Sequence, residues 1–276
     1  MPELPEVETI ANGLRQGGYG NPSILNRRIE NVQLFWERTL AKPSPEELCR
    51  RIIGQTIMTI GRRGKFLVLT LTPDSLIFHL RMSGDLTLEP VDAPIPPHHR
   101  LILYLDGGYR LAFNDTRKFG RVWLVTDLDQ VLKGLGPEPF DPELTPPVFH
   151  NRLIRFHRRI KPLLLDQTFL AGLGNIYTDE ALFLAGLHPL TLSQDLSLPQ
   201  AEKLLASIRM VLQEGIQHHG ASIDWVYRGG NFQNHFRVYQ RTGLPCQICS
   251  TPIQRILVGQ RGTHYCPKCQ NLDQKE

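Results

Sequence analysis

The chain has 276 residues, of which 41% are apolar and 21% are charged, so it has the composition of an ordinary globular protein with one large domain or two smaller ones. No apolar run approaches the roughly 18–20 residues that a membrane span needs, and the first twenty residues lack the basic-then-apolar layout of a secretion signal. Five cysteines are too few for a disulfide scaffold. We therefore expect a cytoplasmic protein that does not associate with membranes.

The net charge of +4 is unevenly distributed along the chain. Residues 1–150 carry 17 Lys and Arg against 18 Asp and Glu, whereas residues 151–276 carry 14 against 9. A basic C-terminal half indicates a polyanionic partner, and nucleic acid is the first candidate. A mildly basic solvated surface would give the same excess, so charge alone leaves both interpretations open.

The N-terminus predicts a helix that begins near Pro5, since proline suits the first helical turn and apolar residues follow at helical spacing. Gly17 and Gly18 end it. A second, short helix is predicted over residues 44–52, where Ser44 and Glu47 match a capping box.

Strand-forming runs then dominate to about residue 126, separated by Gly, Pro and Asp turns. The runs are RRIENVQLF, KFLVLTLT, SLIFHL, RLILYL, YRLAFN and RVWLV. Many short strands with tight turns and flanking helices predict an antiparallel β-sandwich or barrel over residues 1–133.

Five prolines in the sequence GLGPEPFDPELTPP predict a linker over residues 134–149. Helical spacing of apolar residues returns at 148–163, 175–186 and 198–217, which predicts a helical domain over residues 150–222. The remaining residues, 223–276, contain most of the cysteines. The expected fold class is thus α+β with several domains.

Four cysteines have the spacing C-x2-C-x16-C-x2-C; they are Cys246, Cys249, Cys266 and Cys269. Two such pairs can place four thiolates around one tetrahedral ion, so we predict one structural Zn²⁺ with no open coordination position. The 16 intervening residues fit a strand–turn–strand hairpin. Its basic residues could press on a phosphate backbone, or the hairpin could be purely structural.

Pro2 follows the initiator methionine, and loss of Met1 would expose a secondary amine. An α-amino group has an ordinary pKa of about 8, so roughly a tenth of it is neutral and nucleophilic at pH 7. Glu3 is adjacent and Glu6 lies about one helical turn away, which is the pattern for covalent catalysis with a proton-shuttling carboxylate. Acidic residues near a helix start also favour the helix dipole, so this pattern alone does not establish catalysis.

Seven motifs occur in an order that resembles one family: PELPEVET (2–9), GRRGKFLVL (61–69), HLRMSG (79–84), NDTRKFG (114–120), LGPEP (135–139), GLGNIYTDEALF (172–183) and QRGTHYCPKC (260–269). Essentially the whole chain is similar to the formamidopyrimidine-DNA glycosylases, the bacterial 8-oxoguanine repair enzymes. The related endonuclease VIII family typically begins PEGPE, so Leu4 favours the formamidopyrimidine branch.

The resemblance implies an N-terminal β-sandwich with flanking helices, a helix–two-turns–helix domain and a C-terminal zinc-finger hairpin. It also implies a monomeric DNA glycosylase with AP lyase activity, which removes oxidised purines from damaged double-stranded DNA and cleaves the strand by β,δ-elimination. A preference for oxidised pyrimidines is the nearest alternative. A non-catalytic DNA-binding module is the alternative from another class, although such a module would need none of the N-terminal residues.

The resemblance gives Pro2 the role of nucleophile at the sugar C1′, Glu3 that of proton shuttle and Glu6 that of a supporting carboxylate. Lys65 matches a catalytic-site lysine that contacts phosphate beside the lesion; without the resemblance it would be taken as a solvated turn lysine. Trp225, in a segment (220–239) that is a few residues shorter than the family's lesion loop, could stack on a base or simply anchor that loop, and the same holds for Tyr227.

Flipping a base out of a duplex leaves a gap in the stack. The resemblance assigns the filling of that gap to Met82, Arg117 and Phe119, whose chemistry suits the task; ordinary core packing is the alternative for the methionine and the phenylalanine. The residues expected to contact DNA are His98, Arg117, Lys161, Asn175 and Arg261.

Overall fold

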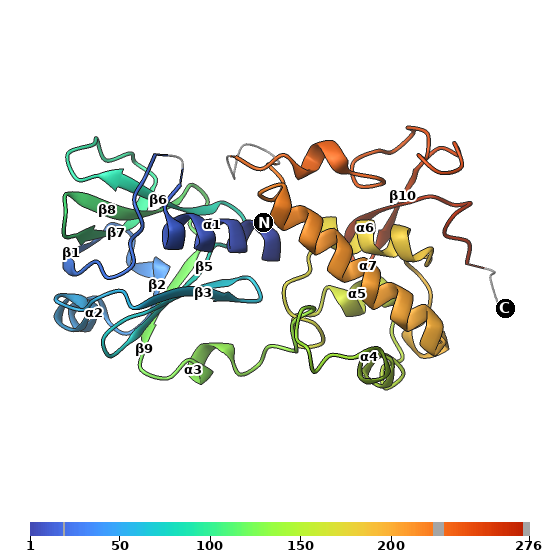
Figure 1. Cartoon of the computed structure of the whole chain (residues 1–276), viewed down its shortest axis with the longest axis horizontal. Coiled ribbons are helices and arrows are strands. Elements are labelled where there is room, and N and C mark those ends of the chain that lie inside the picture. Colours follow the sequence, from blue (N-terminus) through green and yellow to red (C-terminus); the bar gives the residue numbers. More distant parts are fainter. Residues whose placement is uncertain (19, 223–228, 273–276) are drawn as a thin grey trace. The chain divides into compact units, whose positions relative to one another are not determined.

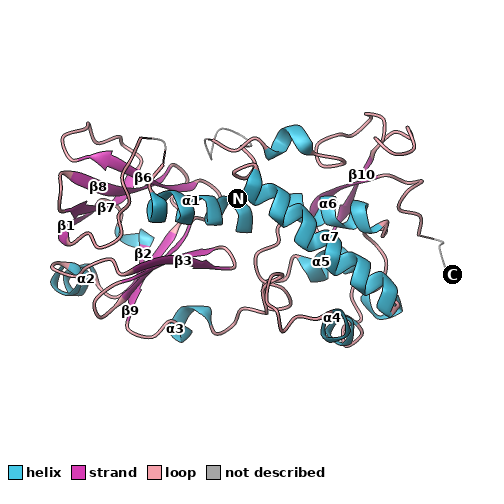
Figure 2. Ribbon diagram, viewed as in Figure 1, coloured by secondary structure: helices cyan, strands magenta, loops and turns pink. Residues whose placement is uncertain are grey.

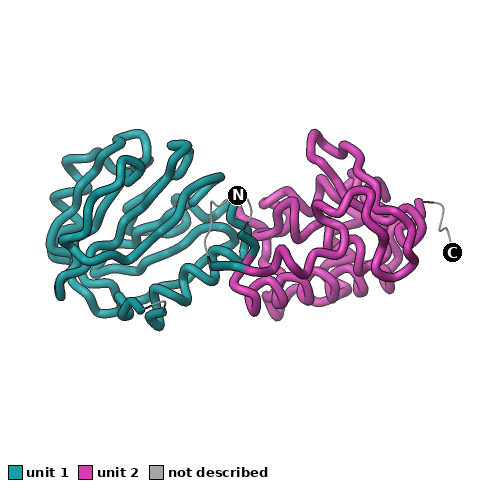
Figure 3. The backbone as a smooth tube through the Cα atoms, turned by 90° about the horizontal axis from the view of Figure 1, so that it is seen from above, with its two compact units in different colours: residues 1–134, 221–230 teal, residues 135–220, 231–276 magenta. Residues whose placement is uncertain are grey.

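The computed structural model describes residues 1–18, 20–222 and 229–272. The chain divides into two compact units, residues 1–134 with 221–230 and residues 135–220 with 231–276 (Figure 3). Strands predominate in the first unit, whereas helices predominate in the second (Figure 2). This α+β architecture, with a C-terminal hairpin that carries four cysteines, confirms the predicted fold class.

These two units differ from the domains predicted from the sequence, which were consecutive segments of the chain. The first unit ends at Gly134, where the proline-rich linker was expected to begin, but the linker residues from Leu135 onward belong to the second unit. Two of the five prolines form the first turn of helix α4 (Pro146–Leu153), where proline is well tolerated. The chain also returns to the first unit at residues 221–230, which a reading of composition along the chain does not detect.

Helix α1 (Leu4–Gln16) begins where Pro5 and the apolar spacing predicted, and its buried face includes Leu4, Val7 and Ala11. It ends at Gly17, whose φ of 77° is unfavourable for other residues and whose Cβ would lie 2.8 Å from the Asn21 carbonyl oxygen. Only glycine therefore fits this helix end. The second predicted helix is α2 (Pro45–Ile52).

Two sheets form the β-sandwich of the first unit (Figure 1). In spatial order, one contains β1 (Ile29–Leu34), β7 (His99–Leu105), β8 (Tyr109–Asp115) and β6 (Gly84–Pro90). The other contains β2 (Leu40–Lys42), β9 (Arg121–Val125), β5 (Ser75–His79), β4 (Phe66–Thr70) and β3 (Thr59–Arg63). All these pairs are antiparallel except β2 with β9. Phe78 of β5 and Phe113 of β8 meet in the core between the sheets, with ring centroids 5.7 Å apart.

Two short elements lie in the connections of the first unit, the 3-10 helix η1 (Glu37–Thr39) and helix α3 (Asp129–Leu132). The second unit contains α4, α5 (Ile160–Leu164), α6 (Asn175–Ala185), α7 (Leu198–Gln217), the 3-10 helices η2 (Ser193–Asp195) and η3 (Phe232–His235), and the hairpin β10 (Gln254–Val258) and β11 (Arg261–Tyr265). The helical stretch predicted at 148–163 is interrupted, because the exposed residues 154–159 separate α4 from α5. No helix in the described ranges is long and apolar enough to cross a membrane.

Candidate active site and nucleic-acid interface

The start of α1 gathers three of the four residues expected to be catalytic, Pro2, Glu3 and Glu6. Glu3 is the N-cap of the helix and is 3% exposed. Its backbone N–H donates to Oε2 of Glu6 at 2.7 Å, while Oε1 of Glu6 accepts from the Ala221 N–H at 2.8 Å. The buried Glu6 carboxylate therefore holds the backbone that follows Pro2 and ties it to the segment that re-enters the first unit. This geometry fits the supporting role expected of Glu6.

Pro2 is buried, whereas Met1 is 51% exposed. The Pro2 nitrogen is an amide nitrogen for as long as Met1 is attached, so it has no nucleophilic lone pair. Since Met1 is accessible, its removal would convert that nitrogen into the secondary amine that the chemistry requires.

Lys65 follows β3, which packs against α1. Arg15 Nε donates to the Ile60 carbonyl oxygen at 2.9 Å, and Arg62 Nε donates to Glu8 Oε2 at 2.7 Å. The strand thus advances toward the N-terminus of the helix, and the turn that carries Lys65 lies at the Pro2 end of α1. With 4% exposure, Lys65 is not the solvated turn lysine of the alternative interpretation.

His79, at the end of β5, is a buried residue of this region that the sequence analysis missed. Its Nδ1 accepts a hydrogen bond from the Arg81 N–H at 3.1 Å, and its ring packs edge-on against Phe66 with the centroids 4.6 Å apart. Burial, assisted by the charges of Arg81 and Lys65, lowers the pKa of His79 to about 3. His79 is therefore a neutral acceptor near the lysine at physiological pH.

This lowered pKa predicts a pH-dependent stability. Between pH 6.5 and pH 3 the unfolded chain binds a proton at His79 that the folded chain does not, so the folded state loses stability as the pH falls. From pH 7 to pH 5 the loss from this group is about 2 kcal/mol. In His79→Asn the amide oxygen replaces Nδ1 as acceptor without titrating, so urea unfolding should show a flatter pH profile than the native chain; an equal slope would contradict the assignment.

The turn between β8 and β9 is organised by the buried Asp115. One carboxylate oxygen accepts from the Ser83 hydroxyl and from the Arg117 N–H (3.2 Å), and the other accepts from the Gly120 N–H at 2.7 Å. The Asp115 N–H also donates to the His98 carbonyl oxygen at 2.9 Å. This single carboxylate therefore fixes the loops that carry the three residues expected to fill the gap in the DNA, and the backbone N–H of the same residue links them to the loop of His98.

The side chains on these loops are exposed. Met82 is 42% exposed and Phe119 is 50% exposed, which excludes the core-packing alternative for both. The guanidinium carbon of Arg117 lies 5.3 Å from the centroid of the Phe119 ring. His98 is also exposed. The first unit thus exposes apolar and cationic side chains together on these loops. Core packing does not explain why apolar side chains occur there.

In the second unit, Asn175 is the first residue of α6, and Arg261 begins β11. The Asn175 Nδ2 donates to the Gly262 carbonyl oxygen at 3.0 Å, which joins the helix start to the tip of the hairpin. Within residues 1–18, 20–222 and 229–272, the buried Oδ1 of Asn175 has no hydrogen-bond partner. Arg261 is exposed beside this junction. A helix start, with its positive dipole end, and an adjacent guanidinium suit a phosphate group.

Lys161 differs from expectation, because it is fully buried. Its ammonium donates to Asp179 Oδ1 at 2.6 Å and to the Gly262 carbonyl oxygen at 3.1 Å. Oδ2 of the same aspartate accepts from the His264 N–H at 2.9 Å. This burial is at odds with the expected direct contact to phosphate. The pair instead joins α5, α6 and β11, and thereby positions the hairpin.

The four cysteine sulfurs lie within 4.8 Å of one another. The Cys246 and Cys269 sulfurs are 3.9 Å apart, and those of Cys249 and Cys266 are 3.4 Å apart. A tetrahedral site with Zn–S bonds of about 2.3 Å requires sulfurs about 3.8 Å apart, so the cluster fits one Zn²⁺. Burial raises the pKa of the Cys266 and Cys269 thiols, because it disfavours the charged thiolate. A bound divalent cation would offset this unfavourable effect.

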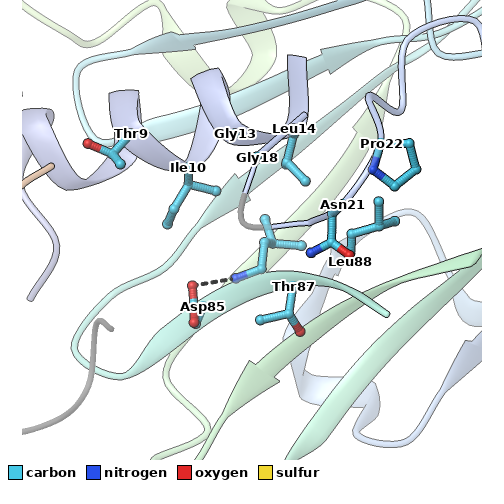
Figure 4. Close-up of a pocket in the computed structure, with 11 residues that line it drawn as sticks. Thr9, Ile10, Gly13, Leu14, Gly18, Asn21, Pro22, Asp85, Thr87 and Leu88 are labelled. Carbon is cyan, nitrogen blue, oxygen red and sulfur yellow. Dashed lines mark hydrogen bonds between the residues drawn. The ribbon is translucent and has the colours of Figure 1, made fainter. Parts of the chain in front are cut away.

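One pocket of the first unit lies away from these residues (Figure 4). Thr9, Ile10 and Leu14 of α1 face Asp85 and Thr87 of β6 across it. It contains none of the residues expected to contact DNA or to act in catalysis.

Trp225 and Tyr227, the two aromatic residues considered for base stacking, lie outside the described residues.

The first unit has a buried carboxylate pair at a helix start, and the helical second unit has a four-cysteine zinc site. These are the features of a DNA glycosylase of the helix–two-turns–helix class. Three family models match in order: the formamidopyrimidine-DNA glycosylase N-terminal domain (residues 1–122), the formamidopyrimidine-DNA glycosylase H2TH domain (135–226) and the zinc finger found in FPG and IleRS (243–272). The chain therefore belongs to the formamidopyrimidine-DNA glycosylase family.

Curated relatives and solved structures agree. The formamidopyrimidine-DNA glycosylase of Chloroflexus aggregans is 46% identical, with 99% of this chain and 100% of the relative covered, and that of Geobacillus kaustophilus is 40% identical, with 98% and 100% covered. A structure of MutM in complex with DNA containing carbocyclic 8-oxo-G has a TM-score of 0.89 at 38% identity, covering 98% of this chain and all of that one. The Lactococcus lactis enzyme bound to DNA with an AP site has a TM-score of 0.88 at 38% identity, covering 98% and 99%.

Proposed function

We propose that this enzyme excises oxidised purines, including 8-oxoguanine and formamidopyrimidines, from duplex DNA and then cleaves the strand at the resulting site. The single observation that carries this proposal is the start of α1, where Glu3 follows the residue that would supply the amine and both Glu3 and Glu6 are buried and joined by a hydrogen bond. The related structures were solved with DNA that contains 8-oxo-G or Fapy-dG, which supports the choice of lesion.

The amine of processed Pro2 would attack C1′ of the damaged nucleotide. A nitrogen–carbon bond forms, the bond from C1′ to the base breaks, and the base leaves with a proton. Glu3 would transfer a proton to the sugar ring oxygen as the base leaves and the ring opens, which gives an iminium ion. That ion acidifies the hydrogens on C2′, so the 3′ phosphate leaves by β-elimination and the 5′ phosphate by δ-elimination. The product is a one-nucleotide gap flanked by phosphates.

The remaining residues would present the lesion to this amine. Met82, Arg117 and Phe119 would occupy the gap left by the flipped base, since they are exposed on loops that Asp115 holds together. Asn175 and Arg261 would bind phosphate from the second unit. Lys65 would bind the phosphate beside the lesion. His98 would contact the backbone near the wedge, the name used below for Met82, Arg117 and Phe119.

Borohydride trapping on a duplex with one 8-oxoguanine opposite cytosine tests the proposal. Borohydride reduces the iminium to a stable amine, so we expect a covalent adduct that mass spectrometry maps to Pro2 in protein that has lost Met1. Protein that retains Met1, which the mass spectrum distinguishes from processed protein, is the matched control and should give no adduct. Tight binding without an adduct from processed protein would favour a non-catalytic DNA-binding module.

A comparison of turnover without borohydride distinguishes the nearest alternative within the class. Faster turnover of a thymine glycol duplex than of the 8-oxoguanine duplex would indicate the endonuclease VIII-like preference for oxidised pyrimidines. We further propose that the enzyme acts as a monomer on chromosomal DNA, because one chain would supply the amine, the residues that fill the gap, the phosphate contacts and the zinc ligands.

A further inference from the structure

Lys118 lies between the two wedge residues Arg117 and Phe119, but its side chain is held by another part of the fold. Its backbone has a φ of 62°, in the left-handed region. Its ammonium nitrogen lies 4.1 Å from the centroid of the Trp36 ring. The Arg38 guanidinium carbon lies 5.9 Å from the same ring. Two cations from separate segments thus share one indole.

The indole is attached to the scaffold that positions the wedge. The Trp36 carbonyl oxygen accepts from the Thr39 N–H at 2.9 Å, which closes the turn into η1. The adjacent Phe35 N–H donates to the Arg100 carbonyl oxygen at 2.9 Å, and Arg100 Nε donates to the Asp115 carbonyl oxygen at 2.7 Å. Trp36 is therefore connected to the residue that orders the β8–β9 turn, so the ring and the lysine are held relative to each other.

This surface is accessible and cationic. Lys118 and Arg38 are exposed, and Phe35 beside them is 41% exposed. An ammonium over an indole face keeps N–H donors free for another acceptor, and its attraction to the ring restricts the long lysine stem before any ligand binds. Phosphate oxygens are the acceptors that two exposed cations beside the same ring suit.

We propose that Trp36 is a positioning residue that holds Lys118 against the DNA backbone next to the wedge, with Arg38 as a second contact on the same strand. The inference rests on the proposed function, because continuity with Arg117 and Phe119 defines the partner as the duplex that carries the lesion. Lys118 thereby adds a contact with the DNA backbone at the point where the wedge residues enter the base stack.

The test measures affinity for a duplex with a tetrahydrofuran abasic analogue over a series of salt concentrations. Lys118→Gln is expected to weaken binding and to reduce the slope of log K against log salt by about 0.9, the value for one phosphate contact. Trp36→Leu should weaken binding about two- to fivefold, the range for an exposed cation–π contact, and Trp36→Phe should restore most of it. Lys133→Gln, at an exposed lysine of the same unit, is the matched control and should change neither quantity.

The double variant decides whether Trp36 acts through Lys118. In a Lys118→Gln background, Trp36→Leu should have a smaller effect than in the native background, because only the Arg38 contact with the ring remains; an equal loss in both backgrounds would show that Trp36 does not act by positioning the lysine. An unchanged salt slope in Lys118→Gln alone would overturn the contact, and this exposed position is independent of any folding defect caused by Trp36→Leu. Borohydride trapping by the native enzyme is run in parallel, so that failure of the proposed function is distinguished from failure of this inference.

Discussion

Replacing Glu3 by glutamine is expected to lower the rate of base release by about 10²- to 10⁴-fold, the contribution typical of a positioned general acid or base. Glutamine has nearly the same shape but cannot take up or release the proton. The N–H of residue 3 still donates to Glu6, so the start of α1 should keep its geometry. Single-turnover excision of 8-oxoguanine from a duplex measures the rate, and affinity for a tetrahydrofuran duplex should be unchanged.

Glu8→Gln is the matched control for this experiment. Glu8 lies in the same helix, but its carboxylate is paired with Arg62 at 2.7 Å. Its substitution removes a negative charge from α1 without removing the proposed proton shuttle, so excision should continue at nearly the native rate. If Glu3→Gln excises 8-oxoguanine as fast as Glu8→Gln, then Glu3 is not the proton shuttle.

The strands that sequence analysis missed share a position in the fold. β2, β3 and β6 each lie at the edge of a sheet. Edge strands need no continuous apolar run, and they commonly carry charged residues that oppose pairing with other chains. Arg62 and Arg63 leave β3 without a continuous apolar run, so no strand was predicted there, although it pairs with β4 over five residues. The interior strands, which are buried on both faces, were predicted from their apolar runs.

The residues of the candidate site likewise fall into those that the sequence predicts and those that depend on the fold. A terminal proline, neighbouring glutamates and four paired cysteines carry their chemistry in local sequence, so Pro2 and the zinc ligands could be named without a fold. Asp115 and Asp179 could not, because their partners are distant in the chain: Asp115 binds Ser83, and Asp179 binds His264. For Lys161 the sequence motif was clear, but its burial depends on packing among three elements.

Removal of zinc is expected to weaken DNA binding by roughly 10- to 100-fold while the first unit stays folded. The factor corresponds to the loss of one charge-assisted hydrogen bond, here from Arg261. A two-stranded hairpin is at best marginally stable alone, and the small core beneath this one includes Cys246 and Cys266 themselves. Without the metal, β11 would lose its position, and the junction of Asn175 with the Gly262 carbonyl oxygen would be lost with it.

The experiment compares Cys249→Ser with Cys49→Ser, which changes an exposed cysteine outside the cluster. The first variant should lose bound zinc and the affinity for a tetrahydrofuran duplex, whereas the second should keep both. In a Trp225→Phe background, which leaves Trp36 and Trp123 as the tryptophans, fluorescence should be the same in the two variants, because the first unit has its own core between two sheets. Unchanged affinity in zinc-free protein would show that the hairpin does not contribute to DNA binding. A loss of the tryptophan signal would show instead that the two units depend on each other for folding.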